Sequence, residues 1–215
     1  MNTHVVETTI ASVGLLPSVR THSLEEALFA VRAILNTGLG VVEVEMNTPD
    51  AARVIEQSCR EFPTAIIGAG TVLDVDTARR GMDAGAKFLG LLGLDDETLA
   101  CAQSRSVAAI VGGLTPTEIL MAWRAGASAV KVFPCGALGG DAYIAALRGT
   151  FPDIPLVAAG GVTQRSAAAF IHAGATALGI GKGIVPPRAL KHQQEDWITE
   201  LVARFRGIVH AARRS

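Results

Sequence analysis

Cysteine is scarce in this chain, and the residues that occur form no recognisable pattern. Cys59, Cys101 and Cys135 lie far apart, and none belongs to a CxxC pair or lies near a histidine cluster. An odd and scattered set argues against a disulfide framework and against a zinc site. We therefore expect a protein of a reducing compartment, with no bound metal.

The chain also lacks a charge excess and a long apolar run. Its formal net charge is −1, its arginines are scattered, and the terminal HAARRS is too short to form a nucleic-acid patch. No stretch approaches the roughly 20 uninterrupted apolar residues of a membrane span. The N-terminal MNTHVVETTI has no basic segment followed by an apolar core, so it does not resemble a signal peptide. These features predict a cytoplasmic protein with neither nucleic acid nor membrane as a partner.

One pattern occurs four times: a helix end, a glycine and then an apolar strand. The glycines are Gly38, Gly85, Gly126 and Gly174, at positions where a left-handed backbone after a helix favours glycine. Three more helix-to-strand passages alternate with them, in FPTAIIGAG, SRSVAAIVGG and FPDIPLVAAGG. With a first strand near SVGLLPSV, the sequence predicts eight β-strand–α-helix units.

Two of the predicted helices begin with a recognisable cap. Ser23 is followed by Glu26 three residues later, and Thr115 is followed by Pro116 and Glu118. Both patterns match the capping box, and proline is favoured at the first helical position.

The order of these elements predicts the fold. Short β-branched strands alternating with helices are typical of a parallel sheet covered on both faces. Eight units in 215 residues favour an α/β fold, a single-domain (β/α)8 TIM barrel over residues 1–215, closed by a C-terminal helix from about Gln193 to Ala212. A doubly wound open sheet is the alternative, and the missing dinucleotide-binding fingerprint near the first strand argues against it.

An apolar strand in SAVKVFPCGALGG has Lys131 at its centre. Active sites of such barrels lie at the carboxyl ends of the strands, and alternate residues of each strand face the interior. Val130 and Val132 suit the helix side, which leaves Lys131 and Phe133 inside.

The same parity in VVEVEMN places Glu43, Glu45 and Asn47 on the interior face, so the barrel holds a lysine and two carboxylates. One interpretation is a purely structural ion pair, because buried charges need partners. The other is catalytic: burial disfavours the charged form of an amine, and a neutral amine attacks a carbonyl to form a Schiff base. A neighbouring carboxylate would then move the protons.

Glycine-rich stretches end the last two predicted strands, as AAGGV and GIGKG, and include Gly160, Gly161, Gly181 and Lys182. Barrels often bind phosphate there, through backbone N–H groups and a helix N-terminus. Ordinary turn formation is the alternative interpretation.

Two further polar residues are open to two interpretations. Thr71, in GAGT, is either a helix cap or a residue of the barrel mouth. Arg20 follows the first strand and either binds a carboxylate bidentately or lies on the surface.

Several motifs together resemble the KDPG/KHG aldolase family, the class I pyruvate aldolases. They are VVEVEMNTP, IGAGTVL, GGLTPTEIL, AVKVFP with ALGG, and AAGGVT, in the family's order and spacing over about residues 16–187. The resemblance implies a (β/α)8 barrel, usually a homotrimer, that works without metal or cofactor on a small 2-oxo acid. Lys131 matches the family's Schiff-base lysine and Glu43 its acid/base glutamate.

The resemblance also assigns substrate contacts. Arg20 and Thr71 match positions near the pyruvate carboxylate, and Gly160 and Gly161 match the phosphate loop. Asn47 stands where the gluconate-type enzymes often have arginine, and it favours the galactonate branch.

The chain departs from the family pattern at four places. Leu91 and Leu92 replace a Ser/Thr–Pro pair, and Val111 replaces a proline. Lys182 and Gly183 stand where a serine often contacts phosphate, and Glu45 replaces a threonine or proline, so that either glutamate could carry the proton.

The expected function is a class I aldolase, a lyase that cleaves a 2-oxo-4-hydroxy acid to pyruvate and an aldehyde. The substrates that the resemblance implies are 2-dehydro-3-deoxy-6-phosphogluconate and its galactonate epimer, which give glyceraldehyde 3-phosphate. Two alternatives stay open at this point: a phosphosugar epimerase or isomerase on the same barrel, and a non-catalytic binding protein on a decayed aldolase scaffold.

Overall fold

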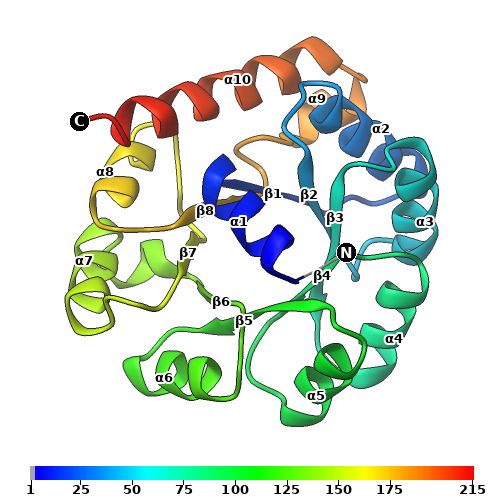
Figure 1. Cartoon of the computed structure of the whole chain (residues 1–215). Coiled ribbons are helices and arrows are strands. Elements are labelled where there is room, and N and C mark those ends of the chain that lie inside the picture. The colour runs from blue at the N-terminus through cyan, green and yellow to red at the C-terminus, as the bar shows by residue number, and fades with distance from the viewer. Residues whose placement is uncertain (1–2) are drawn as a thin grey trace.

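The chain folds into a closed barrel of eight parallel strands, seen in a computed structural model that describes residues 3–215 (Figure 1). Each strand pairs with the next along the chain, and the last pairs with the first. The strands are β1 (Leu15–Val19), β2 (Val41–Glu45), β3 (Ile66–Val72), β4 (Phe88–Leu91), β5 (Ala108–Gly113), β6 (Ala129–Val132), β7 (Leu156–Ala159) and β8 (Ala177–Ile180). The predicted single-domain (β/α)8 barrel is confirmed, and the open-sheet alternative is wrong.

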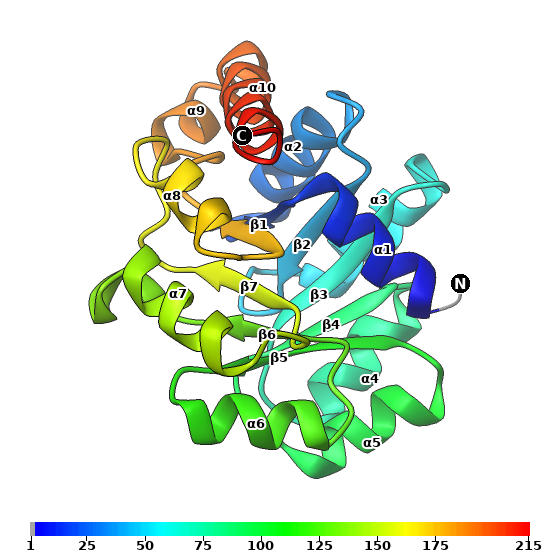
Figure 2. The ribbon, with the colours of Figure 1, turned by 60° about the vertical axis from the view of Figure 1, so that its left-hand side comes forward.

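A ring of helices connects the strands and covers the outside of the barrel (Figures 1 and 2). These helices are α2 (Leu24–Leu35), α3 (Ala51–Glu61), α4 (Val75–Asp83), α5 (Asp96–Ser104), α6 (Pro116–Arg124), α7 (Asp141–Thr150) and α8 (Ala167–His172). Because helices cover their outer face, the strands are apolar on the helix side, as Val42 and Val44 of β2 show by being fully buried.

The glycine pattern that predicted the repeats has the expected backbone geometry. Gly38, Gly85, Gly126 and Gly174 all have a positive φ, between 75° and 101°. This left-handed conformation ends each preceding helix and returns the chain to the barrel, and glycine adopts it without a steric penalty.

Both predicted helix caps form, one completely and one in part. Thr115 and Glu118 make the full reciprocal box at the start of α6. At α2 the Ser23 hydroxyl accepts from the Glu26 N–H, but the Glu26 carboxylate accepts from the N–H of His22, one residue before the cap. The capping box predicts that the Glu26 carboxylate accepts from the N–H of Ser23, and this part of the prediction is wrong by one residue.

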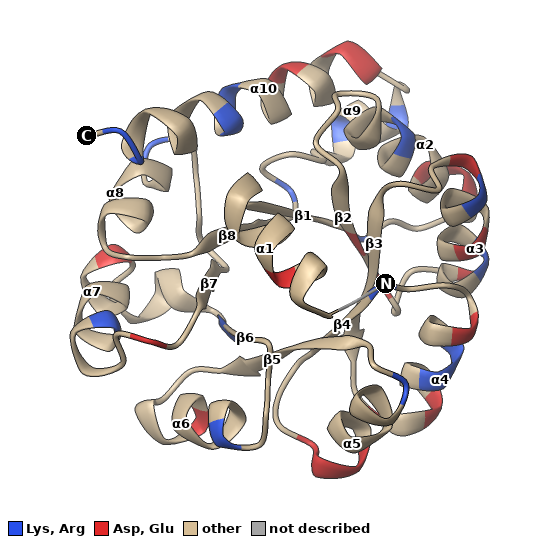
Figure 3. Ribbon diagram, viewed as in Figure 1, with Lys and Arg blue, Asp and Glu red and all other residues tan. Residues whose placement is uncertain are grey.

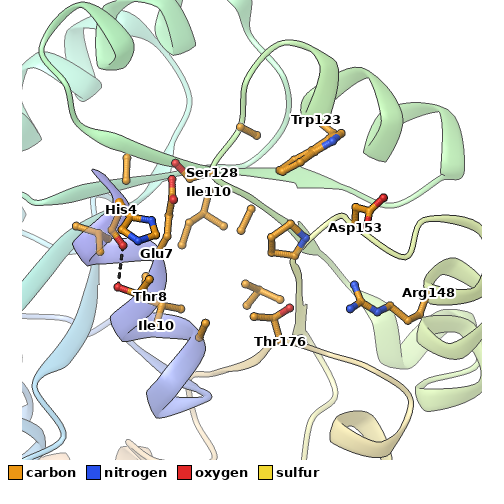
Figure 4. A pocket seen from close by; sticks show the side chains of 17 residues that line it. His4, Glu7, Thr8, Ile10, Ile110, Trp123, Ser128, Arg148, Asp153 and Thr176 are labelled. Carbon is orange, nitrogen blue, oxygen red and sulfur yellow. Dashed lines mark hydrogen bonds between the residues drawn. The ribbon is translucent and has the colours of Figure 1, made fainter. Parts of the chain in front are cut away.

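Besides the short 3-10 helix η1 (Cys135–Leu138), two α-helices of the described residues were not expected from the sequence. The helix α1 (Thr3–Val13) takes up the first residues of the stretch in which we expected β1, and it lies across the amino-terminal end of the barrel (Figures 1 and 2). Val6 and Ile10 are buried beneath it. A cavity of about 350 Å³ remains between α1 and this end of the barrel, lined largely by apolar side chains such as Ile10, Ile110 and Trp123 (Figure 4).

The second unexpected helix is short, α9 (Pro187–Lys191), and it leads into the long closing helix α10 (Glu195–Ala212). The closing helix begins two residues later than the sequence suggested and ends at the expected residue. It packs on α2 and α8, the helices of the first and last barrel units, through Ile198, Val202 and Phe205. It therefore covers the seam where β8 meets β1. Within residues 3–215, no helix has the length and apolar character needed to cross a bilayer.

Candidate active site

The carboxyl ends of the strands surround a cavity of about 570 Å³. Most acidic and basic residues lie on the outer helices, and few lie on the strands that form this cavity (Figure 3). Every side chain or backbone segment that the sequence predicted for the site lines it: Arg20, Glu43, Glu45, Asn47, Thr71, Lys131, Phe133, Gly160, Gly161, Gly181 and Lys182. The predicted residues come from six strands and their loops, and Gly90 on β4 and Gly112 on β5 add the other two. All eight strands thus meet at the end at which such barrels hold their active sites.

Lys131 and Glu43 form a two-pronged ion pair across the barrel interior. The Lys131 Nζ lies 2.8 Å from Oε1 and 2.7 Å from Oε2 of Glu43. The side chains are 16% and 3% exposed, respectively, so the carboxylate is the more deeply buried partner. Since removing either partner would leave a buried charge without compensation, the pair holds both side chains in place. The interior parity inferred for β2 and β6 is confirmed by this contact.

Two glycines that the sequence reasoning missed make room for the Glu43 carboxylate. A Cβ atom added at Gly70 on β3 would overlap the carboxylate, and one added at Gly90 on β4 would lie 2.7 Å from its Oε2. Any larger residue would move Glu43 away from Lys131. A signal was present in the sequence, because glycine inside a strand often marks close approach of another group. The interior parity of β3 and β4 points to both positions.

Glu45 lies one interior position nearer the mouth than Glu43 and contacts two other predicted residues. Its Oε2 is 3.7 Å from Nε of Arg20 and accepts a long hydrogen bond of 3.4 Å from the hydroxyl of Thr71. Thr71 itself has a φ of 54°, in the left-handed region that β-branched residues rarely occupy. Such strain is concentrated at functional sites. The sequence did not reveal this backbone conformation.

The glycine pair after β7 packs against the loop after β6. The N–H of Gly136 donates to the carbonyl of Gly160 at 2.8 Å, and a Cβ at Gly161 would lie 2.9 Å from the Gly136 Cα. The ring of Phe133 lies against Gly160, where an added Cβ would come within 2.9 Å of it. Gly160 and Gly161 have φ values of 78° and 90°, so both positions favour glycine.

One expectation for these loops is wrong. The helices after the two glycine-rich stretches do not begin directly behind them: α8 starts only at Ala167, and α9 starts at Pro187. Between Gly161 and α8, Thr163 and Ser166 bond to each other in a turn that runs directly into α8, because the N–H of Ala167 donates to the carbonyl of Thr163 at 2.9 Å. Any anion held at these loops would therefore rely mainly on backbone N–H groups and on Lys182.

Two of the departures from the family pattern, Leu91 and Leu92, form an apolar side of the mouth. Leu91 is buried in β4, whereas Leu92 is 53% exposed at the rim. A Cβ at Gly112 would overlap the carbonyl oxygen of Leu92, so β5 needs glycine there. At Gly183 an added Cβ would lie 2.9 Å from a methyl group of Ile180, which leaves little room for a serine.

The thiol nearest the site takes no part in the cavity lining. Cys135 is buried behind the loop after β6, where its thiol donates to the carbonyl of Gly160 at 3.4 Å. Burial raises the pKa of this thiol to about 11. It is therefore protonated at neutral pH and a poor nucleophile. Within residues 3–215, no three His, Cys, Asp or Glu side chains gather in a way that would hold a metal ion.

Comparison with known proteins assigns the chain to a protein family. A sequence model of the family "KDPG and KHG aldolase" matches residues 6–201. The chain belongs to this family. It is therefore an aldolase, a lyase, and the isomerase and binding-protein alternatives are set aside.

Named relatives of this aldolase act on both sugar-acid epimers. It is 33% identical to the 2-dehydro-3-deoxy-6-phosphogalactonate aldolase of Escherichia coli strain K12, over 79% of this chain and 83% of that protein. It is 32% identical to the 2-dehydro-3-deoxy-phosphogluconate aldolase of Treponema pallidum strain Nichols, over 88% and 90%. Nearly equal identity to the two leaves the sugar acid open.

A solved structure similar to this aldolase contains a covalent intermediate. The KDPG aldolase of Legionella pneumophila, with pyruvate captured as a covalent carbinolamine, superposes with a TM-score of 0.84 at 29% identity. The match covers 91% of this chain and 95% of that one.

Proposed function

We propose that this aldolase cleaves a 2-oxo-4-hydroxy acid through a Schiff base on Lys131. The observation that carries the proposal is the contact of the Lys131 amine with both oxygens of the buried Glu43 carboxylate. A proton can pass between the two groups without movement of the backbone, so a neutral amine and a carboxylic acid are both accessible forms of the pair. The carbinolamine of the Legionella relative supports covalent chemistry in the family.

The first half of the reaction forms the imine. The neutral amine of Lys131 attacks C2 of the substrate, and the resulting carbinolamine loses its hydroxyl as water to give a protonated imine. Glu43, as the carboxylic acid of the neutral pair, gives its proton to the C2 oxygen during the attack, then takes one from the nitrogen and passes it to the hydroxyl, which leaves as water. The imine nitrogen then carries the positive charge that will accept electrons.

The second half breaks the carbon–carbon bond. Glu43 takes the proton from the C4 hydroxyl, directly or through water, and the C4–O electrons form the aldehyde as the C3–C4 bond breaks. The electrons of that bond move to the imine nitrogen and leave an enamine. Glu43 then returns its proton to C3, and hydrolysis of the imine releases pyruvate and restores the Lys131 amine.

The substrate of the proposal is a 6-phosphorylated 2-dehydro-3-deoxy sugar acid, the gluconate or the galactonate epimer. Gly160, Gly161, Gly181 and Lys182 would hold the phosphate, Arg20 and Thr71 the carboxylate, and Phe133 and Asn47 would flank the chain between them. Holding both ends fixes the C3–C4 bond near Glu43, which accelerates the reaction by orientation. We favour the galactonate epimer because Asn47 is shorter than the arginine common in gluconate-type enzymes.

Borohydride reduction in the presence of pyruvate tests the proposed chemistry. The chain has four lysines, Lys87, Lys131, Lys182 and Lys191, so peptide mass mapping assigns the adduct without ambiguity. We expect a pyruvate adduct on Lys131 that is absent from Lys131→Met. No adduct, or one spread over the exposed lysines, would refute the Schiff-base mechanism. Comparing kcat/KM for the two epimers then decides the substrate.

We further propose that the protein assembles as a homotrimer. Exposed large apolar side chains lie around the barrel mouth: Leu73 after β3, Leu92 after β4 and Leu138 after β6 are 62%, 53% and 47% exposed. Apolar surface of this kind is typical of interfaces between subunits. Light scattering on Leu73→Asp/Leu92→Asp should give a smaller species than the wild type, and an unchanged mass would contradict the proposed interface. The cytoplasmic location stays a prediction.

A further inference from the structure

Glu45 is a mostly buried carboxylate with weak partners. Its side chain is 18% exposed, and the contacts it makes are the ion pair at 3.7 Å to Arg20 and the 3.4 Å hydrogen bond from Thr71. Both distances are at the long end for such contacts, whereas charge-assisted hydrogen bonds usually measure about 2.7–2.9 Å. A carboxylate in this state is poorly compensated for its loss of water. Glu43, by comparison, is fully engaged by Lys131.

Glu45 also lies beside the reacting pair. In the sheet it is the register partner of Gly70, the glycine against which the Glu43 carboxylate rests, and Thr71 is the next residue of that strand. A 2-oxo acid carries its carboxylate on the carbon next to the one that Lys131 attacks, so this carboxylate must bind within a few ångströms of the amine. Arg20 and Thr71 are the donors on this side of the cavity, and Glu45 contacts both.

The charges around the cavity make Glu45 and a substrate carboxylate compete for the same cation, Arg20. Glu43 compensates the charge of Lys131, and Glu45 compensates part of the charge of Arg20. Of the cations that line the cavity among the described residues, Lys182 on the β8 side is the one without a carboxylate partner there. A second carboxylate brought to Arg20 would meet Glu45 at close range, and two like charges at such a distance disfavour each other. The Glu45 carboxylate and the substrate carboxylate therefore cannot both pair closely with the Arg20 guanidinium.

We propose that Glu45 is an internal competitor for the substrate carboxylate. It holds Arg20 and Thr71 in the free enzyme, releases them when a 2-oxo acid binds, and thereby weakens binding of that acid. Glu45 is a specificity-determining residue in this account and takes no part in bond making. The inference rests on the proposed function, since it presupposes that a 2-oxo acid reacts with Lys131.

Glu45→Gln tests the competition with little change of shape. The amide keeps an oxygen that accepts from Thr71 but carries no charge to attract Arg20 or to repel an anion. We expect the pyruvate concentration that gives half-maximal borohydride trapping on Lys131 to fall by about tenfold, the change that corresponds to about 1.4 kcal/mol. Glu61→Gln is the matched control, because Glu61 pairs with Arg32 on the outer surface. It should leave that concentration at the wild-type value.

Two further comparisons separate competition from a structural effect. Pyruvamide has the same carbonyl without the negative charge, so Glu45→Gln should not improve its trapping; equal improvement for both compounds would overturn the proposal. In an Arg20→Met background the gain from Glu45→Gln should shrink at least threefold, because the contested cation is gone. A gain that persists in full would overturn the role assigned to Arg20.

Failure of this inference is distinguishable from failure of the proposed function. Wild-type protein that forms no adduct with pyruvate at any concentration would refute the Schiff base itself. An adduct on Lys131 whose concentration dependence is the same in wild type and Glu45→Gln would refute only the competition by Glu45. Thermal unfolding of each variant shows whether the fold is intact in the comparison.

Discussion

The amine of Lys131 contacts both carboxylate oxygens of Glu43, at 2.8 and 2.7 Å, in a barrel interior where the carboxylate is almost wholly shielded from water. This relationship makes the two residues interdependent in stability as well as in chemistry.

Lys131→Met should destabilise the fold as well as abolish the adduct. The variant leaves the Glu43 carboxylate buried without its cation, a change that costs about 3–5 kcal/mol in comparable pairs. Urea unfolding monitored by circular dichroism measures the loss. Lys131→Met/Glu43→Gln should recover much of it, and Lys191→Met, at an exposed lysine, should change stability by no more than about 0.5 kcal/mol. Equal stability of wild type and Lys131→Met would contradict the prediction.

Gly90→Ala should reduce turnover far more than it reduces stability. The new methyl group would lie 2.7 Å from Oε2 of Glu43 and force the carboxylate away from Lys131. A displacement of about 1 Å at a reacting group lowers the rate by about 100-fold. Gly149→Ala in α7 is the control, because its Cβ meets no atom within 4 Å; it should leave the rate unchanged and stabilise the helix by up to about 1 kcal/mol. Wild-type kcat in Gly90→Ala would refute the glycine cradle.

Acid should weaken two of the helix caps. Asp95 accepts from the Thr98 N–H at 2.9 Å and Asp74 from the Thr77 N–H at 2.7 Å, and hydrogen bonding to Thr98 and Thr77 lowers the pKa of both carboxyl groups below the ordinary 3.8. A lowered pKa in the folded state means that the stabilisation is present above pH 3.8 and is lost as the pH falls further. We expect the Tm advantage of wild type over Asp74→Asn/Asp95→Asn to shrink between pH 6 and pH 3. Asparagine keeps the cap geometry without the charge, so a constant difference would contradict the prediction.

Cys135 should be the slowest thiol to alkylate. Burial raises its pKa to about 11, so little thiolate exists at pH 8, and the side chain is inaccessible. Peptide mapping after iodoacetamide treatment of the native protein should show Cys101, which is partly exposed, modified well before Cys135. In urea all three thiols should react at similar rates. Because the raised pKa favours the protonated thiol in the fold, this group should also cost stability as the pH rises from 9 through 11.

Most of the barrel could be predicted because its units repeat. Gly38, Gly85, Gly126 and Gly174 each end a helix in the same backbone conformation, and this local requirement is visible in the sequence. The helix α1 was missed because SVGLLPSV was read as one strand, although Gly14, which has a φ of 69°, separates α1 from β1 within it. Its stability comes from packing across the barrel end, a tertiary effect that local patterns do not contain.

The site could be predicted in part for a similar reason. Strand parity identified Lys131 and Glu43 because it depends on local geometry alone, which decides the face of the sheet. The distance between two side chains on different strands also depends on the tilt of the strands around the barrel, and the sequence does not give it. The left-handed φ of Thr71 and the start of α8 at Ala167 were also missed, because no residue pattern in the sequence marks either of them.

The glycines beside Glu43 also affect where this protein can tolerate mutation. Gly70, Gly90 and Gly112 contribute no side chains to the level of the barrel that holds Lys131 and Glu43, so that level buries little apolar area. The cohesion of the barrel must then come from the layers beneath it, where side chains such as Phe88 are fully buried. Substitutions that weaken those lower layers lower the free energy of unfolding, and the charged layer contributes little that could offset the loss. Mutational scanning should accordingly find substitutions far from the mouth that abolish activity by unfolding the protein, although they leave the catalytic residues unchanged.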